Sequence, residues 1–323
     1  MEQTEPNNEI NVLPFSFLGL SEAQASLTNS KVVIIPVAYD STTSYKSGAR
    51  DGPLAIIQAS RHMEDYILEL NRDMSGYGIH THPQLEPRTD SPQSMILQIE
   101  NVVSKYASMG KLVVTLGGDH SITIGTVRAH HSFYPDLSVL YFDAHADFRN
   151  EYQGSSHGHA SAARRIYDQV NQLVQVGIRS ISSEEADFIA DNGISSFMWN
   201  NHSKILDDNY PTGYPAFHSL TPEERIAAIT SRLSDNVYIS IDLDVFDPSE
   251  MPSVGTPEPG GLRWNELLSM IRGISERHNI VGFDLVELAP QEGPNFAAYT
   301  AARLAYTAIG YAIQSQELNL NDS

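Results

Sequence analysis

The stretch "LSVLYFDAHAD" (residues 137–147) decides the fold class of this 323-residue chain. Its first half is an apolar run without alternating polar side chains, which is typical of a strand buried on both faces. Its second half places Asp143, His145 and Asp147 at alternate positions directly after that run. Ligands gather at the carboxyl ends of strands in parallel sheets. The stretch therefore predicts an α/β protein with a functional site at the end of this strand.

Strands and helices alternate along the rest of the chain. We predict further strands at residues 31–39, 111–118, 173–179, 236–246 and 280–288. We predict helices at residues 52–70, 91–110, 123–133, 161–169, 184–193, 221–233, 264–277 and 297–314. This alternation contains no linker or repeat, so it predicts one α/β domain over residues 31–323, with a mostly parallel sheet covered on both faces.

The first 30 residues are polar, apart from the apolar island "LPFSFLGL" (residues 13–20). We expect them to form an N-terminal arm that docks on the body of the protein or on a neighbouring subunit. No signal-like segment opens the chain, and no apolar run approaches the roughly 20 residues of a membrane helix. We therefore expect a cytoplasmic protein.

Composition excludes several kinds of site. The chain has no cysteine, so it has no disulfide, no thiolate metal ligand and no cysteine nucleophile. Its formal charge of −20 disfavours binding to nucleic acid or to anionic membranes and mildly favours cationic ligands.

Side chains that can bind metals or do acid–base chemistry follow four predicted strands. They are Asp119 and His120, then Asp143, His145 and Asp147, then Asp242 and Asp244, and finally Glu287. On a strand, side chains two residues apart share a face, so Asp242 and Asp244 are expected to point the same way. This many carboxylates at one edge of a sheet repel each other unless cations lie between them.

Six of these residues form the best candidate metal site. They are His120, Asp143, His145, Asp147, Asp242 and Asp244. The set carries four carboxylates, which two divalent ions balance, and its oxygen-rich chemistry favours Mn²⁺ over a tetrahedral zinc site. Two ions a few ångströms apart generate a bridging hydroxide at neutral pH. We expect Asp147 and either Asp242 or Asp244 to bridge the ions.

Each part of this set also has a simpler explanation. Asp119 and His120 could cap the following helix, and Asp242 and Asp244 could be a solvated strand end. Asp247, which precedes a proline, is better explained as the start of a turn. The three groups together, all at predicted strand ends, favour the metal site.

The same residues resemble the signatures of the ureohydrolase family, which includes arginases and agmatinases. "GGDHSIT" (117–123), "DAHAD" (143–147) and "SIDLDVFDP" (240–248) resemble its three signatures in order. The match extends through "YDSTTSYKSGARDGP" (39–53), "TPEPGGL" (256–262) and "DLVELAP" (284–290), and it covers about residues 31–315. The resemblance, which is greatest to agmatinases, implies a three-layer α/β/α sandwich, two Mn²⁺ ions and hydrolysis of a guanidino group to urea and an amine. Some members use Ni²⁺, and members are commonly homo-oligomers, as trimers or hexamers.

The resemblance also implies roles for individual residues. The six metal ligands are those named above, and Glu287 corresponds to the glutamate that holds the guanidinium. A histidine after the DAHAD segment would transfer protons. Arginases and enteric-type agmatinases carry His-Gly here, which selects His157, whereas "HASAARR" (159–165) is similar to another agmatinase branch and selects His159. We favour His159, although this branch has serine where Gly158 stands. We expect His130 and His131 to be surface or loop residues.

The substrate is predicted less sharply. Arginases hold the α-substituents of arginine partly with an asparagine two residues beyond the DAHAD motif, a position occupied here by Arg149. The resemblance therefore favours agmatine, cleaved to putrescine and urea, or aminopropylagmatine. If Arg149 pairs outward with Glu151 or Asp51, it leaves a cationic guanidino substrate undisturbed, whereas an inward Arg149 favours guanidinobutyrate. Free guanidine and arginine stay open.

Two alternatives lie outside the ureohydrolases. A deacetylase-like amide hydrolase on the same fold would use one zinc and lack the GGDHS ligand, so His120 argues against it. An inactive binding relative is disfavoured because all six ligands and Glu287 are present.

Overall fold

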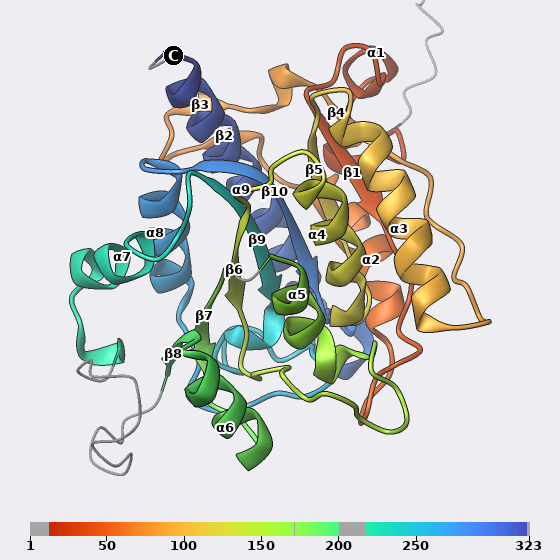
Figure 1. Ribbon diagram of the computed structural model, residues 1–323. Helices are drawn as coiled ribbons and strands as arrows, with labels where there is room; N and C mark the ends of the chain where they lie inside the picture. The colour runs from red at the N-terminus through yellow and green to blue at the C-terminus, as the bar shows by residue number, and fades with distance from the viewer. Residues whose placement is uncertain (1–12, 171, 200–216, 322–323) are drawn as a thin grey trace, which may run out of the picture.

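The core of the molecule is an eight-stranded parallel sheet (Figure 1). The computed structural model describes residues 13–170, 172–199 and 217–321. The sheet strands are β1 (Val32–Pro36), β4 (Ile79–Thr81), β5 (Leu112–Leu116), β6 (Ser138–Phe142), β7 (Leu173–Ile178), β8 (Ser195–Met198), β9 (Asn236–Asp242) and β10 (Asn279–Val286). Their order is β4-β1-β5-β10-β9-β6-β7-β8, and every neighbouring pair runs parallel.

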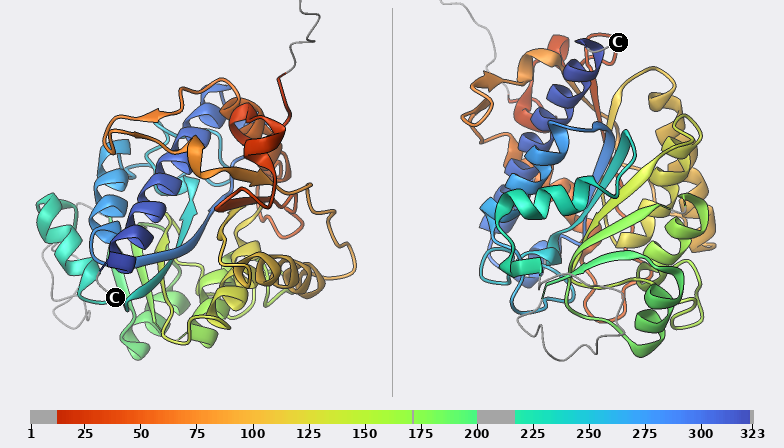
Figure 2. Two further views of the ribbon diagram at one scale, coloured as in Figure 1. Left: turned by 90° about the horizontal axis from the view of Figure 1, so that it is seen from above. Right: turned by 60° about the vertical axis from the view of Figure 1, so that its left-hand side comes forward.

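Helices cover both faces of this sheet. They are α1 (Glu22–Ala25), α2 (Gly52–Ser60), α3 (Pro92–Ala107), α4 (Thr123–His131), α5 (Ala162–Val170), α6 (Ser183–Asn192), α7 (Pro222–Thr230), α8 (Trp264–Ser275) and α9 (Phe296–Asn321). Along β1, Val32 and Ile34 pack with α2, α8 and α9, whereas Val33 and Ile35 pack with α3 and α4. The side chains of a strand therefore alternate between two buried faces. Figure 2 shows helices on both sides of the sheet, and the predicted three-layer α/β/α architecture is confirmed.

Local signals placed some helix starts correctly. The Thr221 side chain accepts a hydrogen bond from the Glu224 N–H (3.3 Å), and the Glu224 carboxylate accepts one from the Thr221 N–H (2.8 Å). This reciprocal pair starts α7 at the predicted residue, because it satisfies two N–H groups that the helix leaves unpaired. Among the described residues, no helix combines the length and apolar character needed to cross a bilayer.

The predicted helix at 52–70 is wrong in its second half. Helix α2 ends at Ser60, and the chain then forms the antiparallel pair β2 (Tyr66–Ile67) and β3 (Arg72–Asp73). Tyr306 on α9 holds this segment, since its hydroxyl donates to the Asp65 carbonyl and accepts from the Met74 N–H (3.0 Å). A contact with a residue so distant in sequence outweighs the local helical periodicity.

The prediction for His130 is also wrong. His130 is buried in α4, where its Nδ1 lies 2.8 Å from the Thr126 carbonyl oxygen and its ring lies 4.9 Å from that of Tyr238. Strand β10 approaches so closely that a Cβ on Gly282 would lie 2.4 Å from the His130 Nε2. The glycine therefore makes room for a core histidine.

Residues 13–30 pack against the rest of the chain. Phe17 is fully buried, and its N–H donates to the Thr81 Oγ1 (2.9 Å). The N–H of Leu18 donates to the Ser60 Oγ (2.9 Å). This part of the predicted arm thus contacts β4 and α2, while residues 1–12 lie outside the described residues.

Candidate metal centre and active site

The predicted ligands meet at the carboxyl ends of four adjacent strands. In the sheet, β5, β10, β9 and β6 are neighbours although they are far apart in sequence. His120 follows β5, Asp143, His145 and Asp147 follow β6, Asp242 ends β9, Asp244 lies just beyond it, and Glu287 follows β10. Because the strands are parallel, all these residues emerge at one edge of the sheet.

Two groups of ligand atoms form there, and they share one residue. Nδ1 of His120 lies 3.0 Å from the Asp143 Oδ2 and 3.1 Å from the Asp242 Oδ2. Nδ1 of His145 lies 2.9 Å from the Asp244 Oδ2 and 3.6 Å from the Asp143 Oδ1. We call these the His120 group (His120, Asp143, Asp242) and the His145 group (Asp143, His145, Asp244). Asp143 belongs to both groups, whereas Asp147, which is expected to bridge the ions together with Asp242 or Asp244, belongs to neither.

Asp147 lies beside the His120 group. Its Oδ2 is 3.6 Å from the His120 Nδ1 and accepts a hydrogen bond from the Tyr141 hydroxyl (2.9 Å). The backbone of Asp147 has a φ of 53°, in the left-handed region that non-glycine residues seldom adopt. The chain has left the strand here, and the two-residue alternation that the sequence suggested no longer applies.

Charge is concentrated in this buried space. Burial raises the pKa of both Asp147 and Asp242 well above the usual range, and the neighbouring carboxylates Asp143 and Asp244, respectively, raise it further. Burial alone would raise the pKa of Asp143 too, but the nearby imidazoles of His120 and His145 lower it below the usual value. In the protein alone, these groups therefore compete for protons.

The same arrangement fits a divalent cation. Asp143 Oδ2 is buried and accepts no hydrogen bond from any described residue, although the His120 Nδ1 is only 3.0 Å away. Two ligand atoms that approach this closely without a hydrogen bond are well placed to share a positive ion. Oxygen ligands with two imidazoles suit Mn²⁺ and similar hard-to-borderline cations.

A buried hydrogen-bond chain that sequence reasoning missed orients His120. Nε2 of His120 lies 2.9 Å from the Ser240 Oγ, and the Ser240 hydroxyl donates to the Asp284 Oδ1 (2.7 Å). Tyr238 donates to the Asp284 Oδ2 (2.7 Å). The single hydroxyl proton of Ser240 goes to Asp284, so Ser240 accepts the proton of Nε2, and Nδ1 of His120 keeps its lone pair for a cation that it would share with the carboxylates.

Arg179 is a further residue near the candidate site that sequence analysis did not identify. Its guanidinium donates to the carbonyl oxygens of Asp244 (2.7 Å), Phe246 (3.1 Å) and Glu258 (2.8 Å). It thereby ties the loop that carries Asp244 to the loop of the TPEPGGL motif. An arginine directly after a buried strand was the available signal.

Glu287 faces the same space. Its Oε1 accepts a hydrogen bond from the backbone N–H of His120 (2.8 Å), and its own N–H donates to the Gly118 carbonyl (2.8 Å). Its backbone φ is 66°, so a second site residue adopts the left-handed region. Such conformations persist only where the surroundings enforce them, and they cluster at functional sites. Burial raises the pKa of Glu287, and the charge of Asp119 adds to the effect.

The two candidate proton-transfer histidines differ in position. Nδ1 of His159 lies 3.9 Å from the Glu287 Oε1, and His159 lines the cavity above the ligand groups. The His157 Nδ1 instead lies 3.0 Å from the Ser156 Oγ and 3.3 Å from the Gln93 Nε2. His157 is not part of the cavity wall. The geometry thus brings His159, and not His157, to the candidate site.

The cavity has a volume of about 240 Å³, and Arg149 forms part of its wall. The Arg149 guanidinium lies over the Tyr152 ring, 4.8 Å from its centroid. No described carboxylate forms an ion pair with Arg149, and Asp51 instead accepts a hydrogen bond from the Gln291 Nε2 (2.9 Å). The outward pairing considered from the sequence is therefore not found.

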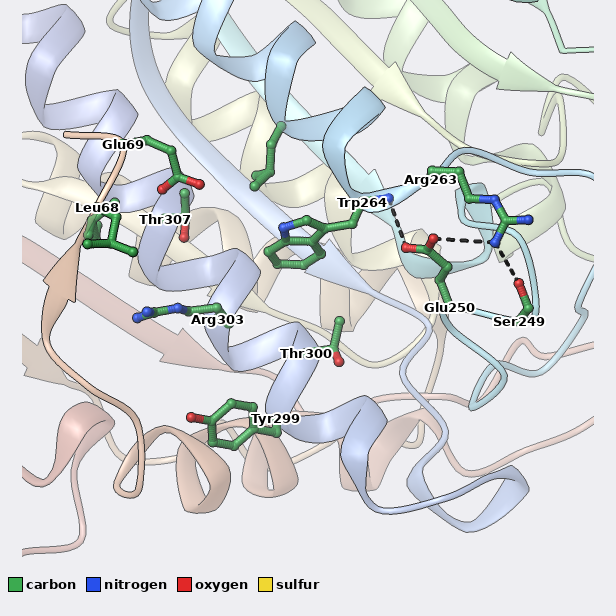
Figure 3. Close-up of a pocket in the computed structure, with 12 residues that line it drawn as sticks. Leu68, Glu69, Ser249, Glu250, Arg263, Trp264, Tyr299, Thr300, Arg303 and Thr307 are labelled. Atoms are coloured by element: carbon green, nitrogen blue, oxygen red, sulfur yellow. Dashed lines mark hydrogen bonds and ion pairs between the residues drawn. The ribbon is translucent and has the colours of Figure 1, made fainter.

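A larger cavity of about 660 Å³ lies between the β2–β3 segment and helices α8 and α9. Figure 3 shows the Trp264 ring between Glu69 on one side and the Glu250–Arg263 ion pair on the other. This cavity includes neither ligand group. Size alone would select this larger cavity, whereas the side-chain chemistry points to the smaller one.

Similarity to known proteins covers almost the whole chain. The sequence profile described as the arginase family matches residues 30–310. The chain is 37% identical over 306 residues to an N(1)-aminopropylagmatine ureohydrolase of Synechocystis sp., covering 93% of this chain and 95% of the relative. It is 32% identical to an agmatinase of Pyrococcus horikoshii, with coverages of 88% and 93%.

A solved structure agrees. The agmatine ureohydrolase of Thermoplasma volcanium superimposes with a TM-score of 0.78 at 30% identity, covering 94% of this chain and 96% of that one. Fold, motif order and sequence similarity extend over the same residues. This chain belongs to the arginase family.

Proposed function

We propose that this protein is a metal-dependent amidinohydrolase that cleaves a cationic guanidino compound to urea and an amine. The observation that carries the proposal is the pair of ligand groups that share Asp143, placed directly beside the buried carboxylate of Glu287. Family membership and relatives named as ureohydrolases support it.

The ligand set favours two Mn²⁺ ions, with Ni²⁺ as the alternative. The His120 group, with Asp147 beside it, would hold one ion, and the His145 group would hold the other. Divalent ions, when bound, lower the pKa of water, which provides a nucleophile at neutral pH.

Glu287 is proposed to bind and orient the guanidinium. A carboxylate pairs with the planar guanidinium through two parallel hydrogen bonds, which fixes the position of the central carbon. The His120 N–H holds one oxygen of Glu287 in place. Since the substrate cation enters a buried space rich in carboxylates, it also offsets part of their mutual repulsion.

His159 is proposed to deliver a proton to the departing amine. An amine leaves readily only after protonation, and an imidazole with a pKa near neutrality can supply the proton. Burial lowers the pKa of His159, which favours release of its proton. Its side chain is mostly buried beside Glu287, where the leaving nitrogen would lie.

We propose an agmatine-type substrate, either agmatine or its aminopropyl derivative. Relatives with both names match this chain at similar coverage. A carboxylate-bearing substrate such as guanidinobutyrate is the alternative. It is supported by one observation, which is that Arg149 lines the cavity and forms no ion pair with a carboxylate of the described residues.

Urea release from manganese-loaded protein tests the proposal. We expect kcat/KM for agmatine or aminopropylagmatine to exceed that for arginine by at least about 100-fold, with guanidinobutyrate and free guanidine assayed in parallel. A clear preference for guanidinobutyrate would identify Arg149 as the specificity residue. Absence of urea release from all five compounds would refute the function.

The two histidines provide a matched pair of variants. We expect His159→Ala to lower kcat by about 100-fold or more, the usual scale for a lost acid–base group, and His157→Ala to have little effect. Metal content should be the same in both, because neither residue belongs to a ligand group. A crippled His157→Ala enzyme beside an active His159→Ala enzyme would reverse the assignment.

A further inference from the structure

We propose that Thr42 is a positioning residue, which transmits the fixed position of Asp119 to the backbone of His159 and so sets the place of the imidazole. The inference rests on the proposed function, because it assigns His159 the proton transfer. It adds a role for the "YDSTT" segment and for the aspartate of the GGDHS motif, neither of which is among the candidate ligands.

Asp119 is the anchor of this arrangement. Its carboxylate is fully buried and accepts four hydrogen bonds. Oδ1 accepts from the backbone N–H (3.1 Å) and the hydroxyl of Ser121, and Oδ2 accepts from the backbone N–H and the hydroxyl of Thr42 (2.9 Å each). The Asp119 backbone N–H donates to the Tyr39 carbonyl (2.7 Å). Both the backbone and the side chain of Asp119 are therefore hydrogen-bonded to the YDSTT segment.

The Thr42 hydroxyl can act toward His159 only as a hydrogen-bond acceptor. A carboxylate accepts and does not donate, so the single hydroxyl proton of Thr42 goes to Asp119. The oxygen lone pair that remains accepts the backbone N–H of His159 (2.9 Å). The chain of hydrogen bonds therefore runs from His159 through Thr42 to Asp119.

The ring of His159 has no comparable anchor. Its Nε2 is buried without a hydrogen-bond partner among the described residues, and its Nδ1 lies 3.9 Å from Glu287, beyond hydrogen-bond distance. The position of the imidazole is therefore set through its backbone.

The neighbouring residue His120 links the same turn to the other substrate-facing group. Its backbone N–H holds Glu287, while Asp119 holds His159 through Thr42. A single turn between β5 and α4 thus fixes the distance between the proposed guanidinium-binding carboxylate and the proposed proton donor. Misplacement of a catalytic group by about 1 Å can cost on the order of 100-fold in rate.

The test compares Thr42→Val with Thr42→Ser. Valine keeps the shape and loses the hydroxyl, so we expect kcat to fall by about 10-fold or more, with KM within about 2-fold and metal content unchanged. Serine restores the hydroxyl and should return kcat to within about 3-fold of the parent enzyme. Thr43→Val is the control. The Thr43 hydroxyl donates to the Asp40 carbonyl (3.2 Å) and not to Asp119, so this change should leave kcat unchanged.

A double variant separates this inference from the proposed function. In the His159→Ala background, Thr42→Val should cause little further loss, because the group that it positions is absent. An additive loss, or full activity of Thr42→Val beside a crippled His159→Ala enzyme, would overturn the role of Thr42. Full activity of His159→Ala would instead refute the proposed proton donor. If Thr42→Val folds poorly, Thr42→Ser against Thr42→Ala repeats the comparison, since those variants differ from each other by the hydroxyl alone.

Discussion

The His120 group and the His145 group contain the same kinds of ligand and share Asp143, yet their surroundings differ. The His120 side chain is 1% exposed, and its Nε2 is tied through Ser240 to Asp284. The His145 side chain is 26% exposed, and its Nε2 faces the partly exposed carboxylate of Glu258 at 3.8 Å. The imidazole of His120 is held by hydrogen bonds in the core, and that of His145 borders solvent.

This difference in surroundings indicates that the two groups differ in their affinity for an ion. A ligand held by buried hydrogen bonds loses little further freedom when it binds an ion, and water cannot compete for it. A ligand near solvent can adjust its position, and its ion can exchange. We therefore expect the inner ion, in the His120 group, to be bound more tightly than the outer ion in the His145 group.

The largest expected effect comes from the shared ligand. Asp143→Asn removes a charge from both groups, so metal content should fall from about two ions toward none and activity should fall by more than about 1,000-fold. Metal analysis after gel filtration measures the first and urea release the second. Asp247→Asn is the control, because Asp247 belongs to neither ligand group and accepts hydrogen bonds from the backbone N–H groups of Ser249 (3.0 Å) and Gly260 (3.1 Å). If Asp143→Asn retains one tightly bound ion, the two groups are more independent than their shared residue indicates.

A selective loss should follow a change behind His120. Asp284→Asn disturbs the chain that fixes the His120 tautomer, so the affinity for one of the two ions should fall by about 10- to 100-fold. Competition with a chromogenic chelator resolves the two dissociation constants, and Ser240→Ala should reproduce the effect. Equal weakening of both ions would show that the buried chain does not distinguish the groups.

The smallest effect is expected at the outer group. Glu258→Gln removes a carboxylate that is more than a third exposed and too distant for a hydrogen bond with His145. The affinity for the weaker ion should fall by less than about 5-fold, and that for the tighter ion should not change. A loss as large as that of Asp284→Asn would mean that His145 depends on its neighbour as strongly as His120 does.

The regular parts of the fold were predictable because burial leaves a simple trace in sequence. Strands covered on both faces are continuous apolar runs, and β1, β5, β6, β9 and β10 were all found in this way. The edge strands β4 and β8 are short and were missed. Helix α2 was extended too far, because the contacts of Tyr306 cannot be inferred from local periodicity.

The sequence indicated which residues could act as metal ligands, but it did not indicate which of them lie together in each ligand group. The left-handed backbone at Asp147 breaks the two-residue alternation of the DAHAD stretch, and nothing in the sequence signals it. Asp284 did leave a trace, since it is a charged residue inside an otherwise apolar strand. Thr42 left none, because its role arises from loops that meet only in the folded protein.

The order of the strands has a consequence for synthesis of the chain. Strand β10, near the end of the sequence, lies between β5 and β9 at the centre of the sheet. Until about residue 290 has left the ribosome, the growing chain lacks Glu287 and leaves β5 and β9 with unpaired edges, which can join other chains. Contacts between such distant segments form slowly, and domains fold as units during translation. A chain truncated before β10 would therefore lack both a central strand of the sheet and the proposed guanidinium-binding carboxylate of Glu287, and it should aggregate instead of folding.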